Sequence, residues 1–517
     1  MADGPRSRRR VRADGANRGR PVTAAHRMAG TFGGFLVPWT LIFGLTLVWA
    51  AATPMFGVPD EVSHMVRAAA AVRGDLAGQV VAGEVRYRAI EVLDPGYIAP
   101  ELAPPSGNVC YAGIRERAAS CLELRAGSRE KQLPSSAVSY PPSYYLLVGW
   151  PTLLTQGASS LYAMRAVSAL IFSALVALAF ANIPPSSRRA SAYLGLSVAA
   201  TPMVWFLGAS ATPSSTAIAA GFATWVGGHR LVTDQQTPPS KLVWRFGLPL
   251  CLLLIVRRDS FIWSAVIVLV LAFLIDVRRI LVLARSRHSW VWAAAASGCA
   301  VIAAASGGHY ASSFVAGTSS SGSASGAFGH LLAYLGEMIG VLGWLDTPLP
   351  GAAYHLWYLA AGALLVGAFS IARWRHAVAL AALLTIIASL IVYFGAQVFP
   401  YFQGRYALPA AIGVPILAGL SLASPQVPHM FPRRAVVIML GLAGIVHLLG
   451  FYQQLRRYAV PGQSTWDLSG SVQWQPEPAP ILVLVAAHVV LAIALSTWIF
   501  CQTRIVDGDS AAVRQAS

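Results

Sequence analysis

The chain has 517 residues, of which 56% are hydrophobic and 11% are charged, and its formal net charge is +17. Soluble globular proteins carry about 25% charged residues, so this composition, with its repeated long apolar runs, excludes an ordinary soluble protein. The positive charge comes almost entirely from arginines between the apolar runs. This pattern is typical of the cytoplasmic loops of membrane proteins, and it leaves no soluble domain to bind nucleic acid.

The N-terminal segment, residues 1–30, is polar and rich in arginine. This composition predicts a disordered basic tail on the cytoplasmic side of a membrane. The apolar run that follows is too long for a signal peptide, and it has no cleavage site of small residues. We therefore expect a membrane domain over residues 31–503 and a second cytoplasmic tail over residues 504–517.

Twelve apolar segments predict an all-α polytopic membrane protein with about 12 transmembrane helices. They lie near residues 32–53, 161–183, 190–207, 213–231, 243–256, 260–276, 290–307, 352–371, 376–398, 406–424, 434–452 and 480–502. The fifth and sixth segments are short for a full crossing, which favours a tilted hairpin there. Two further segments, about 142–156 and 328–345, are rich in glycine, proline and aromatic residues and indicate interfacial or re-entrant helices.

The loops on one side of this topology are all basic, which predicts that this side and both termini lie in the cytoplasm. Their basic residues are Arg188, Arg189, Lys241, Arg278, Arg279, Arg285, Arg287, Arg373, Arg375, Arg433, Arg434, Arg504 and Arg514. The alanine- and arginine-rich, lysine-poor usage is typical of GC-rich bacterial genomes, so we expect a bacterial plasma membrane. The opposite, extracytoplasmic side then carries a large first loop at 54–139, an extracytoplasmic or re-entrant segment at 308–350 and a loop at 454–479.

The first loop begins with Pro59-Asp60-Glu61. A proline followed by acids predicts a helix start, which would place Asp60, His64 and Arg67 on one helical face. Asp60 there could act as a general base, and Asp60, Glu61 and His64 could bind a divalent cation such as Mg²⁺ or Mn²⁺. The alternative is structural: the two acids complement the helix dipole, and His64 makes only a packing contact.

Other motifs lie on the same predicted side. Tyr140 enters a proline-fixed turn, either as part of an aromatic belt or to stack on a sugar. The group Arg257, Arg258 and Asp259 forms either a loop-tip salt bridge or a site for a lipid phosphate. The first loop also contains Cys110 and Cys121, which could pair in an oxidising compartment.

Two more motifs follow along the chain. Trp344 and Asp346 either form a turn before Pro348 or line a substrate pocket. Gln403, Arg405 and Tyr406 form either an interface anchor or a contact to an anionic headgroup. Arg456 and Arg457 lie in a predicted extracytoplasmic loop, although basic residues are usually found in cytoplasmic loops. The simplest interpretation is that this loop is solvated.

The order and spacing of these motifs over about residues 35–500 resemble the bacterial membrane-protein family labelled domain of unknown function 2142. That family in turn resembles the GT-C superfamily of membrane glycosyltransferases, which have an acidic pair in the first outer loop and use polyprenyl-phosphate sugar donors. The resemblance assigns Asp60 and Glu61 as the catalytic pair and implies a GT-C-like fold. Residues 211–215 depart from the more polar stretch expected there.

The resemblance leads to the hypothesis that the protein moves a sugar from a polyprenyl-phosphate donor to a cell-envelope polymer or lipid acceptor on the extracytoplasmic face. Asp60 would deprotonate the acceptor, and arginine would stabilise the leaving phosphate. The expected substrate-binding residues are His64, Arg67, Tyr140, Arg257, Arg258, Asp259, Trp344, Asp346, Gln403, Arg405 and Tyr406. The alternatives are a transporter or flippase of a lipid-linked precursor and a non-catalytic subunit of envelope assembly.

Overall fold

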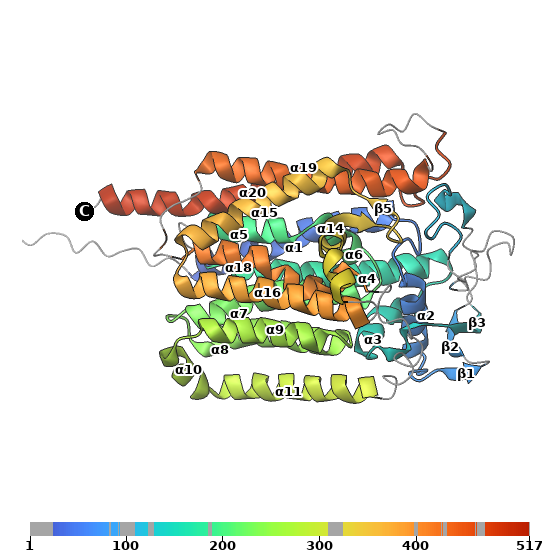
Figure 1. The fold of residues 1–517 in the computed structure, drawn as a ribbon, viewed down its shortest axis with the longest axis horizontal. Helices are drawn as coiled ribbons and strands as arrows, with labels where there is room; N and C mark the ends of the chain where they lie inside the picture. Colours follow the sequence, from blue (N-terminus) through green and yellow to red (C-terminus); the bar gives the residue numbers. More distant parts are fainter. Residues whose placement is uncertain are drawn as a thin grey trace, which may run out of the picture.

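The computed structural model is a bundle of long helices lying side by side, with most of the shorter elements gathered at one end (Figure 1). The structure describes residues 24–81, 84–90, 93, 109–122, 129–184, 189–308, 324–397, 402–424, 427, 432–460, 462 and 471–515. Most of the predicted basic tail therefore lies outside the described residues. The all-α polytopic fold predicted from the apolar runs is confirmed.

Each of the twelve predicted spans coincides with a helix or a broken helix. These are α1 (Ala24–Ala52), α4 (Ala158–Asn182), α5 (Arg189–Ala199) with α6 (Pro202–Gly208), α7 (Pro213–Thr233), α8 (Pro239–Val256), α9 (Ser260–Leu274), α11 (Arg287–Gly308), α15 (Gly351–Ile371), α16 (Trp374–Gln397), α17 (Leu408–Ala411) with α18 (Gly413–Leu422), α19 (Arg433–Ala459) and α20 (Ile481–Gln515).

Fewer of these helices satisfy the length and apolarity of a full crossing than the sequence suggested. Within the described ranges, nine helices do so, or ten if α5 and α6, which are bent by 68° at their junction, form one broken span. The helices outside this set are α7 and the 15-residue α9. The helix α8 begins at Pro239, so its 18 residues are long enough to cross, which corrects the expected short fifth segment, whereas α9 is short as expected.

Several short elements gather around α2 (Glu61–Ala71), and we call this end of the bundle the α2 end (Figure 1). An antiparallel sheet, absent from the sequence prediction, lies there in the order β1 (Gln79–Val81), β2 (Glu84–Ile90) and β3 (Glu130–Pro134). Its register places Tyr87 opposite Leu133. Cys110 and Cys121 form a disulfide, with Cα atoms 6.2 Å apart.

The two segments expected to be interfacial or re-entrant also consist of short elements. The first contains α3 (Ser143–Gly149) and a 3₁₀ turn at Trp150–Leu153. The second contains α13 (Ala324–Gly329), α14 (Leu331–Gly340) and a hairpin of β4 (Val341–Leu342) and β5 (Thr347–Pro348). Most of the loop that precedes α13 lies outside the described residues.

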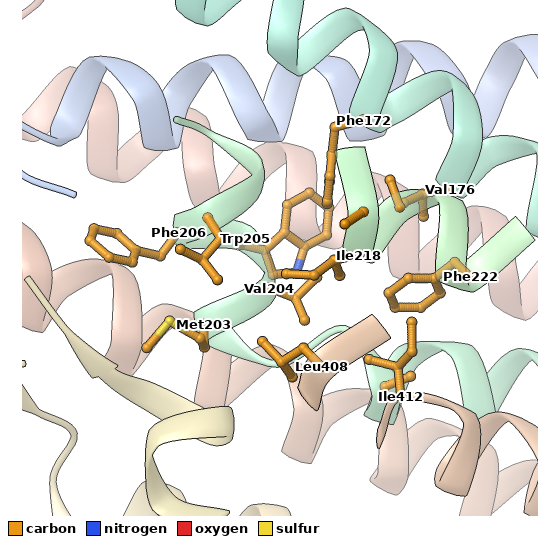
Figure 2. Packing of buried hydrophobic residues seen from close by; sticks show 14 of the residues in the cluster. Phe172, Val176, Met203, Val204, Trp205, Phe206, Ile218, Phe222, Leu408 and Ile412 are labelled. Atoms are coloured by element: carbon orange, nitrogen blue, oxygen red, sulfur yellow. The ribbon is translucent and has the colours of Figure 1, made fainter. Parts of the chain in front are cut away.

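Small and apolar residues let the helices pack closely. A Cβ atom added at Gly195 on α5 would lie 2.5 Å from the Pro415 carbonyl oxygen on α18, so the two backbones meet where no side chain fits. Figure 2 shows the apolar side of this packing, where Trp205 of α6 lies against Phe172 of α4. The bundle can therefore place side chains at the α2 end on rigid supports.

The helix α19 continues beyond its predicted end, through Ala459. Arg456 and Arg457 thus lie in its last turn and are buried, which corrects the solvated loop expected from residue 454 onward. The charge of Arg457 tolerates burial because its Nη2 atom lies 2.7 Å from Asp346 Oδ2. Arg457 also donates hydrogen bonds to three carbonyl oxygens of the first loop, those of Tyr111, Ile114 and Arg117.

Candidate functional site

Glu61 is fully buried, with 0% of its surface exposed. Its carboxylate accepts hydrogen bonds from Arg165 Nε at 2.9 Å and Nη2 at 2.6 Å, and from the Ala211 backbone N–H at 3.0 Å. Arg165 also donates to three carbonyl oxygens at and just beyond the end of α1, those of Ala50, Thr53 and Pro54. This network joins α1, α2 and α4, and it favours the structural alternative for Glu61 over the catalytic one.

Trp344 and Asp346 likewise make contacts within the protein. The Trp344 indole N–H donates to the Phe56 carbonyl at 3.1 Å, which ties the β4–β5 hairpin to the connection between α1 and α2. Asp346 pairs with Arg457, and its other carboxylate oxygen accepts from the Thr347 hydroxyl at 2.8 Å. These contacts favour the structural alternatives for both residues over the substrate pocket.

Asp60 differs from its neighbour in both backbone and exposure. It precedes the first turn of α2 with φ of 66°, in the left-handed region, and its side chain caps no backbone N–H. The side chain is 50% exposed. The sequence predicted that Asp60 shares a helical face with His64 and Arg67. This is wrong, because the helix begins one residue later, at Glu61.

Arg405 is the cationic partner of Asp60. Its Nη2 atom lies 3.6 Å from Asp60 Oδ2, a distance longer than a tight salt bridge. The Arg405 side chain is only 5% exposed, and its Nε atom has no hydrogen-bond partner among the described residues. A buried guanidinium with a free N–H can bind an additional anionic oxygen.

Close backbone packing fixes Arg405 in place. A Cβ atom at the preceding Gly404 would lie 2.0 Å from the Tyr334 carbonyl oxygen of α14, so only glycine fits there. The Gly404 N–H donates to Glu337 Oε2 at 2.6 Å. Glu337 is not among the residues predicted from the sequence, although an acid inside the apolar segment at 328–345 is a usable signal of a functional residue.

A second arginine group borders the same site. Arg257 forms two hydrogen bonds with the Asp259 carboxylate, at 2.8 and 3.0 Å, and one with the Ser214 hydroxyl. Asp259 also accepts from the Trp263 indole at 3.1 Å. The adjacent Arg258 is partly exposed, and it forms no ion pair with any described residue. Arg258 is therefore available to a ligand, whereas Arg257 is already paired.

Tyrosines connect these groups. The Arg257 guanidinium lies 5.2 Å from the Tyr406 ring centre and 5.9 Å from that of Tyr140, and Arg405 lies 5.6 Å from Tyr406. Burial raises the pKa of Tyr140 to about 12 despite the nearby positive charge of Arg257. Tyr140 is thus a neutral ring, and the faces of Tyr140 and Tyr406 stack on cations of the site.

His64 and Arg67 lie behind these rings. His64 Nδ1 is 2.9 Å from the Tyr145 hydroxyl, and Arg67 donates to the Tyr87 hydroxyl and, at 2.9 Å, to the Tyr140 carbonyl. Burial, together with the positive charges of Arg257, Arg405 and Arg67, lowers the pKa of His64 to about 3. His64 is therefore neutral at physiological pH.

The expected metal site is not assembled. Among the residues that the structure describes, no three histidine, cysteine, aspartate or glutamate side chains are close enough together to bind a metal ion. Of the three predicted ligands, Glu61 is paired with Arg165, and His64 faces Tyr145. Asp60 alone remains open to a ligand.

The structure thus brings together most of the predicted residues. Asp60, His64, Arg67, Tyr140, Arg257, Asp259, Arg405 and Tyr406 form a chain of contacts at the α2 end. Gln403 lies next to this group, and its Oε1 atom is buried without a hydrogen-bond partner in the described chain. The arrangement combines one open carboxylate with several cations, which suits a ligand that carries both hydroxyl and anionic groups.

The comparison with known protein families covers most of this site. The family described as a predicted membrane protein (DUF2142) matches residues 43–414. That range extends from within α1 to the start of α18 and contains every candidate residue from Asp60 to Tyr406. No curated protein matches the chain.

Proposed function

Since the chain belongs to the DUF2142 family of predicted membrane proteins, we propose that it is a membrane glycosyltransferase that acts at the α2 end. The donor is a polyprenyl-phosphate-linked sugar, and the acceptor is a hydroxyl of a cell-envelope polymer or lipid. The α2 end faces the extracytoplasmic side of a bacterial plasma membrane, because the basic loops lie at the opposite end of the bundle.

One observation supports this proposal most directly: the half-exposed Asp60 carboxylate lies 3.6 Å from a buried Arg405 that retains a free N–H. An exposed carboxylate is a suitable general base, and a buried guanidinium is a suitable partner for a developing phosphate charge. Both are attached to rigid elements, α2 and the packed Gly404 turn.

The proposed reaction is a single displacement at the anomeric carbon. Asp60 accepts the proton of the acceptor hydroxyl while that oxygen forms a bond to the anomeric carbon. The bond between the anomeric carbon and the phosphate oxygen breaks, and polyprenyl phosphate leaves with the electron pair. Arg405 and Arg258 stabilise that phosphate, while Arg257 mainly positions Tyr140 and Tyr406 by cation–π contact.

Two parts of the original hypothesis change in this proposal. Glu61 is removed from the catalytic pair because its oxygens are saturated by Arg165 and Ala211. A divalent cation, if the reaction uses Mg²⁺ or Mn²⁺, would have Asp60 as its protein ligand and take its remaining ligands from the donor phosphate and water.

The test uses the purified protein in lipid nanodiscs with radiolabelled polyprenyl-phosphate sugars and a cell-envelope extract as acceptor. We expect Asp60→Asn to lower the transfer rate by about 10²–10⁴-fold, the usual contribution of a general base. Arg405→Ala should also lower the rate, and Arg405→Lys should retain part of it. Glu84→Gln is the control, because Glu84 is an exposed acid of the nearby sheet.

Full transfer by a normally folded Asp60→Asn protein would contradict the assignment of the base. Movement of the lipid-linked sugar across the bilayer without transfer would instead favour the transporter alternative. Both variants must elute as the wild type does in size-exclusion chromatography before their rates are compared.

A further inference from the structure

A second potential site lies inside the bundle, away from Asp60. A cavity with about 660 Å³ of atom-free space, including its open mouth, lies between α1, α4, α5, α6, α19 and α20. Its lining residues come from candidate spans or from the bent α5–α6 pair. The cavity therefore lies at a depth where hydrocarbon surrounds the protein.

The two histidines of this cavity lie at one end. The helix α19 ends at the α2 end and α20 begins there (Figure 1). His447 is the lining residue of α19 nearest that end, and His488 is the corresponding residue of α20. Farther from the α2 end the lining is mainly apolar, for example Leu440 on α19 and Ile499 on α20.

The nitrogens at this polar end lack partners. Both ring nitrogens of His488, Nδ1 of His447 and the indole nitrogen of Trp205 are buried without a hydrogen-bond partner among the described residues. His488 is 2% exposed, and its ring stacks on Phe451 with centres 4.3 Å apart. Unpaired polar atoms inside a membrane are unfavourable, so a ligand that supplies hydrogen bonds here would be stabilised.

The neighbouring apolar residues hold Trp205 in place. Figure 2 shows Trp205 beside Phe172, with Val176, another lining residue, on the same helix α4 as Phe172. The Trp205 ring also meets the His447 ring edge-on, with centres 6.0 Å apart. The polar end is therefore fixed by packing and is not a loose surface.

The shape of the cavity and its lack of charge define the ligand class. From His488 to Ile499 the wall follows one face of α20 for eleven residues, which is about 16 Å at 1.5 Å per residue. Among the residues that the structure describes, no arginine, lysine, aspartate or glutamate lines the cavity. A phosphate would have no countercharge there. A neutral imidazole offers one donor and one acceptor, and a hydroxyl group complements both.

We propose that this cavity binds a neutral single-chain lipid alcohol, with its hydroxyl at His447 and His488 and its hydrocarbon chain along α19 and α20. The proposal does not depend on glycosyl transfer at Asp60. It requires only that the imidazoles at the polar end recognise the oxygen and that the apolar walls accept the chain.

Two glycines of α19 provide a matched test. Gly444 lines the cavity, and a Cβ atom there would have no heavy atom within 4 Å, so leucine can extend into the empty space. Gly441 has the same open surroundings but lies on the exposed face and does not line the cavity. Leucine improves helix propensity equally at both positions, so the two variants differ mainly in whether the cavity is filled.

The experiment labels the full-length protein in nanodiscs with a photoactivatable long-chain alcohol and maps the labelled peptides by mass spectrometry. We expect saturable labelling of α19 and α20, which Gly444→Leu reduces at least about tenfold and Gly441→Leu leaves unchanged. Hexadecanol should compete about fivefold better than hexadecane, since one hydrogen bond distinguishes the two. It should compete at least about tenfold better than hexadecyl phosphate, since the charge excludes the phosphate. A His447→Phe, His488→Phe double variant should lose this preference.

Equal labelling of wild type and Gly444→Leu would overturn the proposal. Equal competition by hexadecane would show that the histidines recognise no oxygen and that the cavity contains only water or non-specific lipid tails. Equal competition by hexadecyl phosphate would make the ligand an anionic lipid and would also contradict the proposal.

Discussion

Asp60 and Glu61 are adjacent in the chain, and each meets an arginine, but the two pairs are opposite in character. Glu61 and Arg165 are both buried, lie 2.6 Å apart and have every oxygen and most N–H groups satisfied. Asp60 is half-exposed, lies 3.6 Å from Arg405 and leaves one N–H of that arginine free. One pair fixes the framework, and the other retains unused hydrogen-bonding capacity at the surface.

The contrast shows that an acidic pair in a sequence need not act as a pair. The backbone separates the two side chains because Asp60 adopts a left-handed conformation before the helix, whereas Glu61 begins it. Glu61 then pairs with Arg165 of α4, whereas the Asp60 side chain stays half-exposed. The following predictions test this division, beginning with the largest expected change in stability.

Glu61→Gln should destabilise the protein by about 3–5 kcal/mol, because it leaves the buried charge of Arg165 without its counterion. Thermal denaturation of the purified protein, followed by size-exclusion chromatography, measures this change. Asp60→Asn serves as the matched control and should change stability by less than about 0.5 kcal/mol, since a half-exposed ion pair contributes little. Equal stability losses in the two variants would contradict the assignment of Glu61 to the structural framework and of Asp60 to the candidate site.

Reducing the disulfide between Cys110 and Cys121 should lower stability by about 3 kcal/mol in the chain-entropy view of a short closed loop. This loop supplies the Tyr111, Ile114 and Arg117 carbonyls that bind Arg457, so the loss concerns the framework. Comparison of the melting temperature with and without reductant checks the prediction, and a Cys110→Ser, Cys121→Ser double variant should not respond to reductant. An unchanged melting temperature in the wild type would show that the loop is held without the bond.

The smallest expected effect concerns His64. Its pKa of about 3 in the folded protein lies below the ordinary value of 6.5, so the unfolded chain binds a proton that the folded protein excludes. Stability should therefore fall as the pH decreases below 6.5, by at most about 2 kcal/mol from this residue at pH 5. The His64→Asn variant should be less sensitive between pH 7 and pH 5 in thermal denaturation. An identical pH dependence in both proteins would mean that His64 is protonated when folded.

The sequence predicted the membrane helices well because long apolar runs are local signals. It did not predict the roles of Glu61 or Asp346, because their partners Arg165 and Arg457 are distant in the chain. A charge inside an apolar run was nevertheless visible at Arg165, within the predicted span at 161–183, and it indicated a buried partner.

The end of α19 shows a second limit of sequence reasoning. Hydropathy alone ends that helix near residue 452, because Arg456 and Arg457 oppose burial in hydrocarbon. In the structure the helix continues through Ala459, because Asp346 neutralises Arg457 and first-loop carbonyls accept its remaining hydrogen bonds. Only the three-dimensional arrangement supplies those partners. The same holds for the 3.6 Å approach of Arg405 to Asp60.

The disulfide also serves as a marker of orientation. Reducing thiol systems keep cysteines unpaired in the cytosol of most bacteria, so a bond between Cys110 and Cys121 in freshly isolated cells would place the α2 end on the far side of the membrane. Because every span is connected to that end through the bundle, one covalent bond would fix the sidedness of all the helices. The oxidation state of these two cysteines in the cell would therefore report the orientation of the protein in the membrane.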